Sequence, residues 1–414
     1  MSGYQDNTMA LLFISNVVPD QEVFRNKAFN RSGNNVIMGI CDSLPDTIQY
    51  TLISCRPVPS FPSGKIYIKG EKVRLDSGRE VYIIPTLNIK IIKNLFWGVW
   101  MFFYIKKWAK HYRTEQLDIL VYNIYTPPIS WLYKSAKRTK SRLFAILYDL
   151  GVPPKRLKLS RLTMLGYKRM ESLAHKYIPL LDGRIVINEN IIDHYAPGKD
   201  FILIDGGISN SIVKKLFPIK ETESGPLQLV CAGMLWDQNG TKLILSTMKK
   251  YPDLNAVVHF AGNGIDVPLI IEASKSDSRI KYEGMLNVDN LFKLYEKSDV
   301  LLNLRIEEAI DYHFPSKLLE YMATGKLVLS TPIAHAQRDY KDLIIFLEEI
   351  TPDGLYKKIL EINSLGKEEF IKRGEITRRF MLEQRQWNSR TKEIINYIHG
   401  NVSKFLIENT IKRE

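Results

Sequence analysis

The chain has 414 residues, of which 45% are hydrophobic and 25% are charged, proportions that are ordinary for a soluble globular protein. This length exceeds what one hydrophobic core usually organises, so we expect two domains. The formal net charge is +13, and the three scattered cysteines, Cys41, Cys55 and Cys231, have no metal-ligand spacing, which favours a reducing compartment.

The first half of the chain alternates between strand-like and helix-like segments. Buried, β-rich runs occur at 10–15, 81–85, 118–122, 142–148, 184–188 and 201–204. Helical stretches such as 95–111 separate them. This alternation predicts an α/β fold with a parallel sheet.

Positive charge is concentrated in residues 91–170. They hold 16 Lys and Arg against Glu115, Asp118 and Asp149, a net charge of +13 that equals the charge of the whole chain. Such a field should attract a membrane surface, a phosphorylated lipid or a nucleic acid, and a solvated face without a partner is the alternative. We expect no nucleic acid, because no RNA motif, zinc-finger spacing or helix-turn-helix pattern is present.

Two segments of this basic region could contact lipid. Residues 95–105 are apolar nearly all round but far shorter than the ~20 residues that span a bilayer, so we expect a buried helix with one aromatic edge towards lipid. Residues 155–177 are basic and amphipathic, and they predict either an interfacial helix or a plain surface helix. Since no signal-peptide pattern opens the chain, we expect a cytoplasmic protein, peripheral on the inner membrane face.

A polar segment with proline and glycine, 218–226, is the predicted linker. It divides the chain into a first domain, 1–217, and a second domain, 227–375. Residues 376–414 are expected to form C-terminal helices.

The segment 313–332 carries the strongest functional pattern. A helix should open at 314–316, where proline is tolerated in the first turn, and stop at Gly325. Its start combines unpaired backbone N–H groups, the positive end of the helix dipole and Lys317, which together can hold phosphate. Glu320, one turn on, can accept hydrogen bonds from a ribose. We interpret this as a nucleoside-diphosphate site, and an ordinary core helix with solvated charges is the alternative.

This segment, F-P-S-K-L-L-E-Y-M-A-T-G, resembles the donor-binding helix of GT-B glycosyltransferases, in particular the retaining glycosyltransferase family 4 (group 1). Three further stretches fit the family in the expected order: 227–241, 257–264 and 279–304. The resemblance implies two Rossmann-like domains facing a cleft, the first for the acceptor and the second for the donor. A turn at 205–208 would close the first domain, and the last helix would cross back to it near 386–387.

The resemblance also implies the site. Lys317 and Arg305 would stabilise the leaving diphosphate, and Asp149 would serve as an acceptor-side base, with a turn cap before Gly151 as the alternative for Asp149. Tyr312 and His313 would face the donor sugar. The nucleotide-binding residues would be Gly233, Gly240, Gly262, Gly264, Met285, Ser316, Lys317 and Glu320.

The chain departs from the family pattern at two places. The first glutamate of the usual pair is Tyr312, and the usual basic residues after the first donor-domain strand are replaced by the loop 236–240. Positive charge for the diphosphate must therefore come from Arg305 and Lys317, with Lys242 as a third candidate.

The expected activity is transfer of a sugar from a nucleoside-diphosphate sugar to a hydroxyl of a lipid-linked or saccharide acceptor, in polysaccharide or glycolipid synthesis. The family implies retention of configuration, and the chain has no D-x-D motif, so we expect no metal and no cofactor beyond the nucleotide sugar. A nucleotide-sugar epimerase of the same fold and a non-catalytic subunit that recruits a partner to the membrane are the alternatives.

Overall fold

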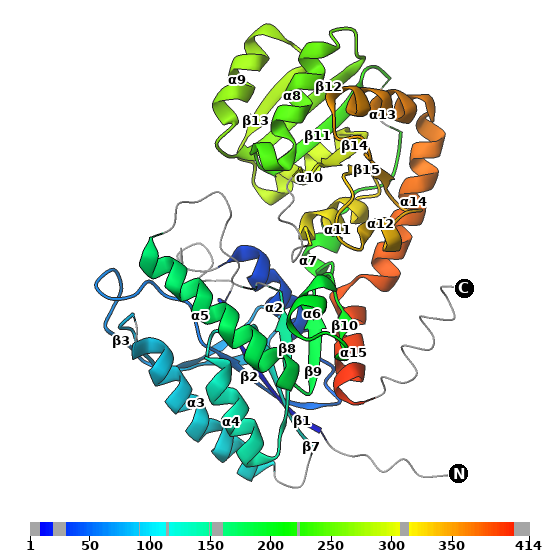
Figure 1. The fold of residues 1–414 in the computed structure, drawn as a ribbon. Coiled ribbons are helices and arrows are strands. Elements are labelled where there is room, and N and C mark those ends of the chain that lie inside the picture. The colour runs from blue at the N-terminus through cyan, green and yellow to red at the C-terminus, as the bar shows by residue number, and fades with distance from the viewer. Residues whose placement is uncertain are drawn as a thin grey trace, which may run out of the picture. The chain divides into compact units, whose positions relative to one another are not determined.

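A computed structural model describes residues 9–19, 30–90, 92–112, 116–148, 150, 160–221, 224–306 and 314–400. The chain forms two compact units (Figure 1). Unit 1 contains the residues up to Asp205 together with those from Trp387 onward, and unit 2 is Gly206–Gln386.

The boundary between the units lies earlier than the expected linker at 218–226. Residues 206–221 belong to unit 2 because their side chains pack there: Ile219 lies against Gly325, and the Phe217 ring receives the cations of Lys326 and Arg378. The chain passes from unit 1 to unit 2 between Asp205 and Gly206, and it returns to unit 1 between Gln386 and Trp387. The first position lies in the segment 205–208, where the family resemblance implies a turn that closes the first domain, and the second lies at 386–387, where it implies the return of the chain.

Unit 1 is built on an eight-stranded sheet in the order β10-β9-β8-β7-β1-β2-β5-β4. All neighbours pair in parallel except β4 and β5, so the expected parallel α/β sheet is confirmed. The strands are β1 (Met9–Ser15), β2 (Gln49–Ser54), β4 (Glu71–Arg74), β5 (Glu80–Ile83), β7 (Gln116–Tyr122), β8 (Arg142–Leu147), β9 (Gly183–Val186) and β10 (Ile202–Leu203). The central strand β1 is buried throughout, as expected where helices cover both faces.

The helices of unit 1 connect these strands. They are α2 (Arg31–Ser43), α3 (Ile92–His111), α4 (Ile129–Thr139), α5 (Arg161–Tyr177), the 3₁₀ turn η1 (Ile178–Leu180), α6 (Asn190–Tyr195) and α15 (Trp387–Ile398). A small antiparallel pair joins β3 (Tyr67–Ile68) to β6 (Thr86–Leu87). Asn30 caps α2 by accepting hydrogen bonds from the backbone N–H groups of Ser32 and Gly33.

The last helix, α15, is an integral part of unit 1. Trp387 packs on Gly39 of α2, where any added Cβ would lie 2.3 Å from the indole. The buried Arg390 guanidinium pairs with Asp205 at 3.3 Å and also donates to the carbonyl oxygen of Leu203. These contacts explain why the chain returns to unit 1 after Gln386.

Unit 2 is built on a six-stranded, fully parallel sheet in the order β13-β12-β11-β14-β15-β16. Its strands are β11 (Leu227–Met234), β12 (Ala256–Asn263), β13 (Ile280–Gly284), β14 (Val300–Asn303), β15 (Leu327–Ser330) and β16 (Ile345–Phe346). The chain runs from β11 outward to β13 and then returns to β14 on the other side of β11. A topological switch point therefore lies between β11 and β14, where doubly wound sheets bind ligands beyond the carboxyl ends of their strands.

The other elements of unit 2 are α7 (Asn210–Val213), η2 (Asp237–Asn239), α8 (Thr241–Lys250), α9 (Val267–Ser276), α10 (Val288–Lys297), α11 (Ser316–Ala323), α12 (Ala336–Asp339), α13 (Pro352–Ser364) and α14 (Lys367–Gln384). A single apolar core of aliphatic side chains fills the space between sheet and helices.

Lys326 precedes β15 with only 8% of its surface exposed. Burial lowers its pKa to about 8, a shift that Asp299 and Glu296 oppose and that Lys367 and Arg378 reinforce. The folded pKa lies below the ordinary value of 10.5. The charged form therefore destabilises the native state below pH 8, and this cost disappears as the pH rises from 8 to 10.5.

Replacing Lys326 with methionine should remove this cost. We expect Lys326→Met to raise the free energy of unfolding at pH 7 by about 1–3 kcal/mol. Denaturant titrations should show this gain in the free energy of unfolding becoming smaller as the pH rises from 8 to 10.5. The control is Lys372→Met on an exposed position of α14, and an equal gain in that variant would contradict the explanation by burial.

Candidate functional site

Two glycines shape the carboxyl edge of the sheet in unit 2. Gly233 near the end of β11 pairs in register with Gly262 of β12, and both have positive φ, +114° and +142°. A Cβ on Gly262 would lie 1.9 Å from the carbonyl oxygen of Gly233, and a Cβ on Gly233 would lie 1.9 Å from the Nζ atom of Lys317. Only glycine allows this close approach of two strands and a lysine side chain.

Helix α11 brings its first turn to this edge. Pro315 is its N-cap, and among the described residues no side chain caps the helix start. Leu318, Leu319 and Tyr321 are buried in the core of the unit, while Lys317 and Glu320 are half-buried. The positive end of the helix dipole and the Lys317 ammonium therefore lie at the same place, as expected of an anion site.

Lys317 and Glu320 are two ionisable groups in a poorly solvated position, and each influences the pKa of the other. The Lys317 ammonium donates a hydrogen bond to the carbonyl oxygen of Ala232. Burial lowers the pKa of Lys317, while the neighbouring Glu320 carboxylate opposes the shift. Burial raises the pKa of Glu320, which also accepts a hydrogen bond from the Tyr295 hydroxyl at 3.5 Å. A cation with so little solvent attracts an anion more strongly than an exposed one.

Arg305 approaches from the strand on the other side of β11. Its backbone N–H donates to Oγ1 of Thr331 at 2.8 Å, and its guanidinium donates to Oδ1 of Asn239 at 2.5 Å. Arg305 and Lys317 are close enough for the arginine charge to lower the lysine pKa. The two cations therefore lie at the switch point between β11 and β14, together with Gly233.

Cys231 lies beside both cations but is not expected to react. Burial raises the pKa of its thiol to about 11, despite the opposing charges of Lys317 and Arg305. The thiol is therefore protonated at neutral pH and acts as a small apolar residue.

The other predicted residues lie along the same edge. Gly240, with φ +80°, joins η2 to α8 and packs on Leu304, where a Cβ would be 2.5 Å from the leucine Cβ. Gly264 follows β12 and lies against the carbonyl oxygen of Leu235. Ser316 is the exposed first residue of α11.

Two further predicted positions are exposed on the surface of unit 2. Met285 follows β13, two strands from β11, and is 76% exposed. Lys242 on α8 is exposed and pairs with Asp237 at 3.2 Å. Asp149, Tyr312 and His313 lie outside the described residues, so their roles stay predictions.

The sequence did not single out the polar contacts that hold the site in place. The Tyr321 hydroxyl accepts a hydrogen bond from the backbone N–H of Ala232 at 3.3 Å, and the Tyr295 and Tyr321 rings meet edge to face at 5.4 Å. Both tyrosines are buried. A buried tyrosine hydroxyl usually needs a hydrogen-bond partner. Tyr295 on the apolar face of α10 and Tyr321 on that of α11 were therefore the sequence signals from which such contacts could have been predicted.

Comparisons with known proteins agree with this geometry. Residues 226–364 match the family model described as "Glycosyl transferases group 1". A search of curated proteins finds no match to the chain.

Solved structures resemble the chain over nearly its whole length. The glycosyltransferase from Rickettsia africae ESF-5 superimposes with a TM-score of 0.64 at 15% identity, covering 94% of this chain and 98% of its own. The lipopolysaccharide outer core galactosyltransferase WaaB gives 0.62 at 14% identity, with 95% and 100% covered. Anabaena Alr3699/HepE in complex with UDP gives 0.60 at 12% identity, with 95% and 100% covered.

At these identities the structural likeness concerns the fold, and it extends over both units. The family match covers the sheet, the glycine edge and α11 of unit 2. The chain therefore has the GT-B fold predicted from its sequence, and residues 226–364 of its second unit are similar to the group 1 glycosyl transferases.

Proposed function

We propose that the protein transfers a sugar from a nucleoside-diphosphate sugar to an acceptor hydroxyl, and that unit 2 binds the donor. The observation that carries this proposal is the position of Lys317. Lys317 lies in the first turn of α11, and its ammonium lies against Gly233 of β11. Arg305, which follows the neighbouring strand β14, is close enough to influence the pKa of Lys317. The Anabaena structure that shares the fold holds UDP, which supports a nucleoside diphosphate as the ligand class.

The proposed chemistry follows from the charges at this edge. As the anomeric bond breaks, negative charge builds on the diphosphate oxygens, and cations already in place stabilise that charge without reorganisation. Lys317 and Arg305 supply these cations, and the α11 dipole adds to them. We further propose that transfer proceeds with retention and without a metal.

Glu320 should hold the nucleoside through hydrogen bonds from ribose hydroxyls. Glu320→Gln removes the charged acceptor and leaves its shape, so we expect UDP to bind about 10-fold more weakly, as calorimetry would measure. The control is Glu296→Gln, on α10 of the same unit. Unchanged UDP affinity in Glu320→Gln would exclude Glu320 from the ribose site.

Donor turnover tests the reaction class. Purified protein with a panel of nucleoside-diphosphate sugars should release nucleoside diphosphate faster when a membrane extract supplies acceptors. An epimerase would instead interconvert nucleotide sugars without any acceptor. A non-catalytic subunit would bind the nucleotide without turnover under either condition.

We propose that the acceptor is lipid-linked and that unit 1 docks on an anionic membrane at the cytoplasmic face, in glycolipid or polysaccharide synthesis. Exposed apolar side chains follow one stripe of α3: Ile92, Leu95, Val99 and Phe103. Three exposed lysines continue the helix beyond this stripe, Lys106, Lys107 and Lys110. Apolar and cationic side chains on one helix face suit an interface with anionic lipid. Among the described helices, none is both long and apolar enough to cross a membrane.

The stripe of α3 can be tested without altering the charge. Each Leu or Phe side chain that enters the lipid contributes about 1.5–3 kcal/mol, so Leu95→Ser with Phe103→Ser should weaken binding to anionic vesicles by a factor of about 100 or more. The control is Leu269→Ser with Ile271→Ser, which removes two exposed apolar residues from α9 of unit 2.

Vesicle co-sedimentation would measure the difference between the two double variants. Equal pelleting of wild type with neutral and anionic vesicles would contradict the proposed membrane surface. Equal loss in both double variants would contradict the assignment to α3.

A further inference from the structure

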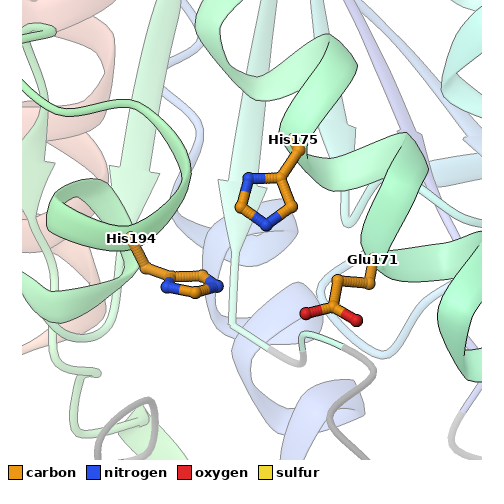
Figure 2. A group of neighbouring side chains, drawn as sticks. All are labelled: Glu171, His175 and His194. Carbon is orange, nitrogen blue, oxygen red and sulfur yellow. The ribbon is translucent and has the colours of Figure 1, made fainter.

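Three side chains with metal-ligating atoms converge on the surface of unit 1. Glu171 and His175 lie one turn apart on α5, and His194 comes from α6 (Figure 2). The ligating atoms of the three residues lie within 4.8 Å of one another, and all three residues are exposed. Figure 2 shows the carboxylate and both imidazole rings turned towards a common space.

The backbone that carries these side chains is fixed by packing. On α5, Ala174 is buried next to His175, and Tyr177 anchors the end of the helix. On α6, Ile192 and Tyr195 are buried on either side of His194. The His175 ring lies 4.8 Å from the Tyr195 ring and 5.0 Å from the His194 ring, between centroids. The His175 ring of α5 therefore lies beside two rings of α6, those of His194 and Tyr195, which brings the two imidazoles together.

The set of donors suits a divalent transition metal. Two imidazole nitrogens and a carboxylate oxygen are ligands that Zn²⁺ accepts, with bonds of about 2.0–2.2 Å. In a tetrahedral site such bonds place ligand atoms about 3.4 Å apart. Rotation of exposed side chains can close the remaining gap, since the Cα positions need not move. Three protein ligands leave a coordination position open to solvent.

We propose that Glu171, His175 and His194 bind Zn²⁺ or a similar divalent metal and thereby link α5 to α6. This inference goes beyond the proposed sugar transfer, because the donor residues lie in unit 2. A metal that binds only the folded chain stabilises it. Because all three ligands are exposed to solvent, an exchangeable site is expected rather than a permanently occupied one.

Zn²⁺ binding to the full-length protein tests the proposal. The protein is purified without a polyhistidine tag, stripped with a chelator, and titrated with Zn²⁺ by calorimetry in the absence of nucleotide. One equivalent should bind in the micromolar range or more tightly, and the Tm should rise by a few degrees. Loss of even an outer-shell partner weakens metal sites about 10–100-fold, so His175→Ala and His194→Ala should each weaken binding at least tenfold.

Two further variants make the result specific. Glu171→Gln keeps an oxygen but loses the charge, so it should weaken binding less than either histidine variant. His111→Ala removes another exposed histidine, at the end of α3, and should bind Zn²⁺ like the wild type. The absence of a saturable equivalent, or equal binding by wild type and His194→Ala, would overturn the proposal. Circular dichroism of each variant would confirm that it is folded.

Discussion

Lys317→Ala is expected to lower kcat for sugar transfer by about 10²–10³, the usual cost of losing one preorganised electrostatic contact to a developing charge. The structure gives Lys317 the required position, because it lies in the first turn of α11 with its ammonium against Gly233. Steady-state kinetics with a nucleoside-diphosphate sugar would measure the change.

Stability separates this electrostatic role from a structural one. Burial lowers the pKa of Lys317, so its charged form costs the native state free energy at neutral pH. Removing the cation also leaves the Glu320 carboxylate without its positive neighbour, so the two effects oppose each other and the alanine variant should unfold at a Tm close to that of the wild type. Lys242→Ala, on the exposed surface of α8, is the control and should keep wild-type turnover. A Lys317→Ala variant with most of its activity would remove Lys317 from the site.

Gly262→Ala is expected to destabilise unit 2 by more than about 4 kcal/mol, which is exceptional for a single substitution. The added Cβ would meet the carbonyl oxygen of Gly233 at 1.9 Å, and φ is +142° at this position. Neither strand can yield easily, because β11 and β12 pair along their whole lengths. Denaturant unfolding would give the loss directly, and UDP affinity should fall as the glycine edge is displaced.

Gly225→Ala is the matched control for the backbone conformation. Gly225 also has a positive φ, +146°, but no atom lies within 4 Å of the position that its Cβ would take. This variant should lose only about 1–3 kcal/mol, the cost of a sparsely populated backbone conformation for an L-residue. Equal losses in the two variants would show that the close approach of the strands contributes nothing to the effect at Gly262.

The local features of the donor site could be predicted from the sequence. The proline in the first turn and the glycine stop predicted a helix between 314–316 and Gly325. In the structure, α11 spans Ser316–Ala323, and Gly325 has a left-handed backbone conformation. These signals depend on residues adjacent in sequence, so one chain suffices to detect them. The family resemblance of 227–241 and 257–264, rather than local signals, pointed to Gly233 and Gly262, which lie one residue before the ends of β11 and β12.

Features that depend on distant residues could not be predicted in this way. Tyr321 contacts Ala232 across 89 positions of sequence, and nothing near Tyr321 reveals that partner. The boundary between the units lies after Asp205 rather than in the polar segment 218–226, because Phe217 and Ile219 pack on unit 2. The same limit applies to His175 and His194, which come from two different helices and meet only in the folded chain.

A crystal structure of the protein with UDP tests the donor site most directly, with other nucleoside diphosphates in parallel. We predict that the diphosphate lies beyond Gly233, within hydrogen-bond distance of the Lys317 ammonium and near the Arg305 guanidinium, with the ribose towards Glu320. A nucleotide bound elsewhere in unit 2, or on unit 1 with these residues unoccupied, would contradict it.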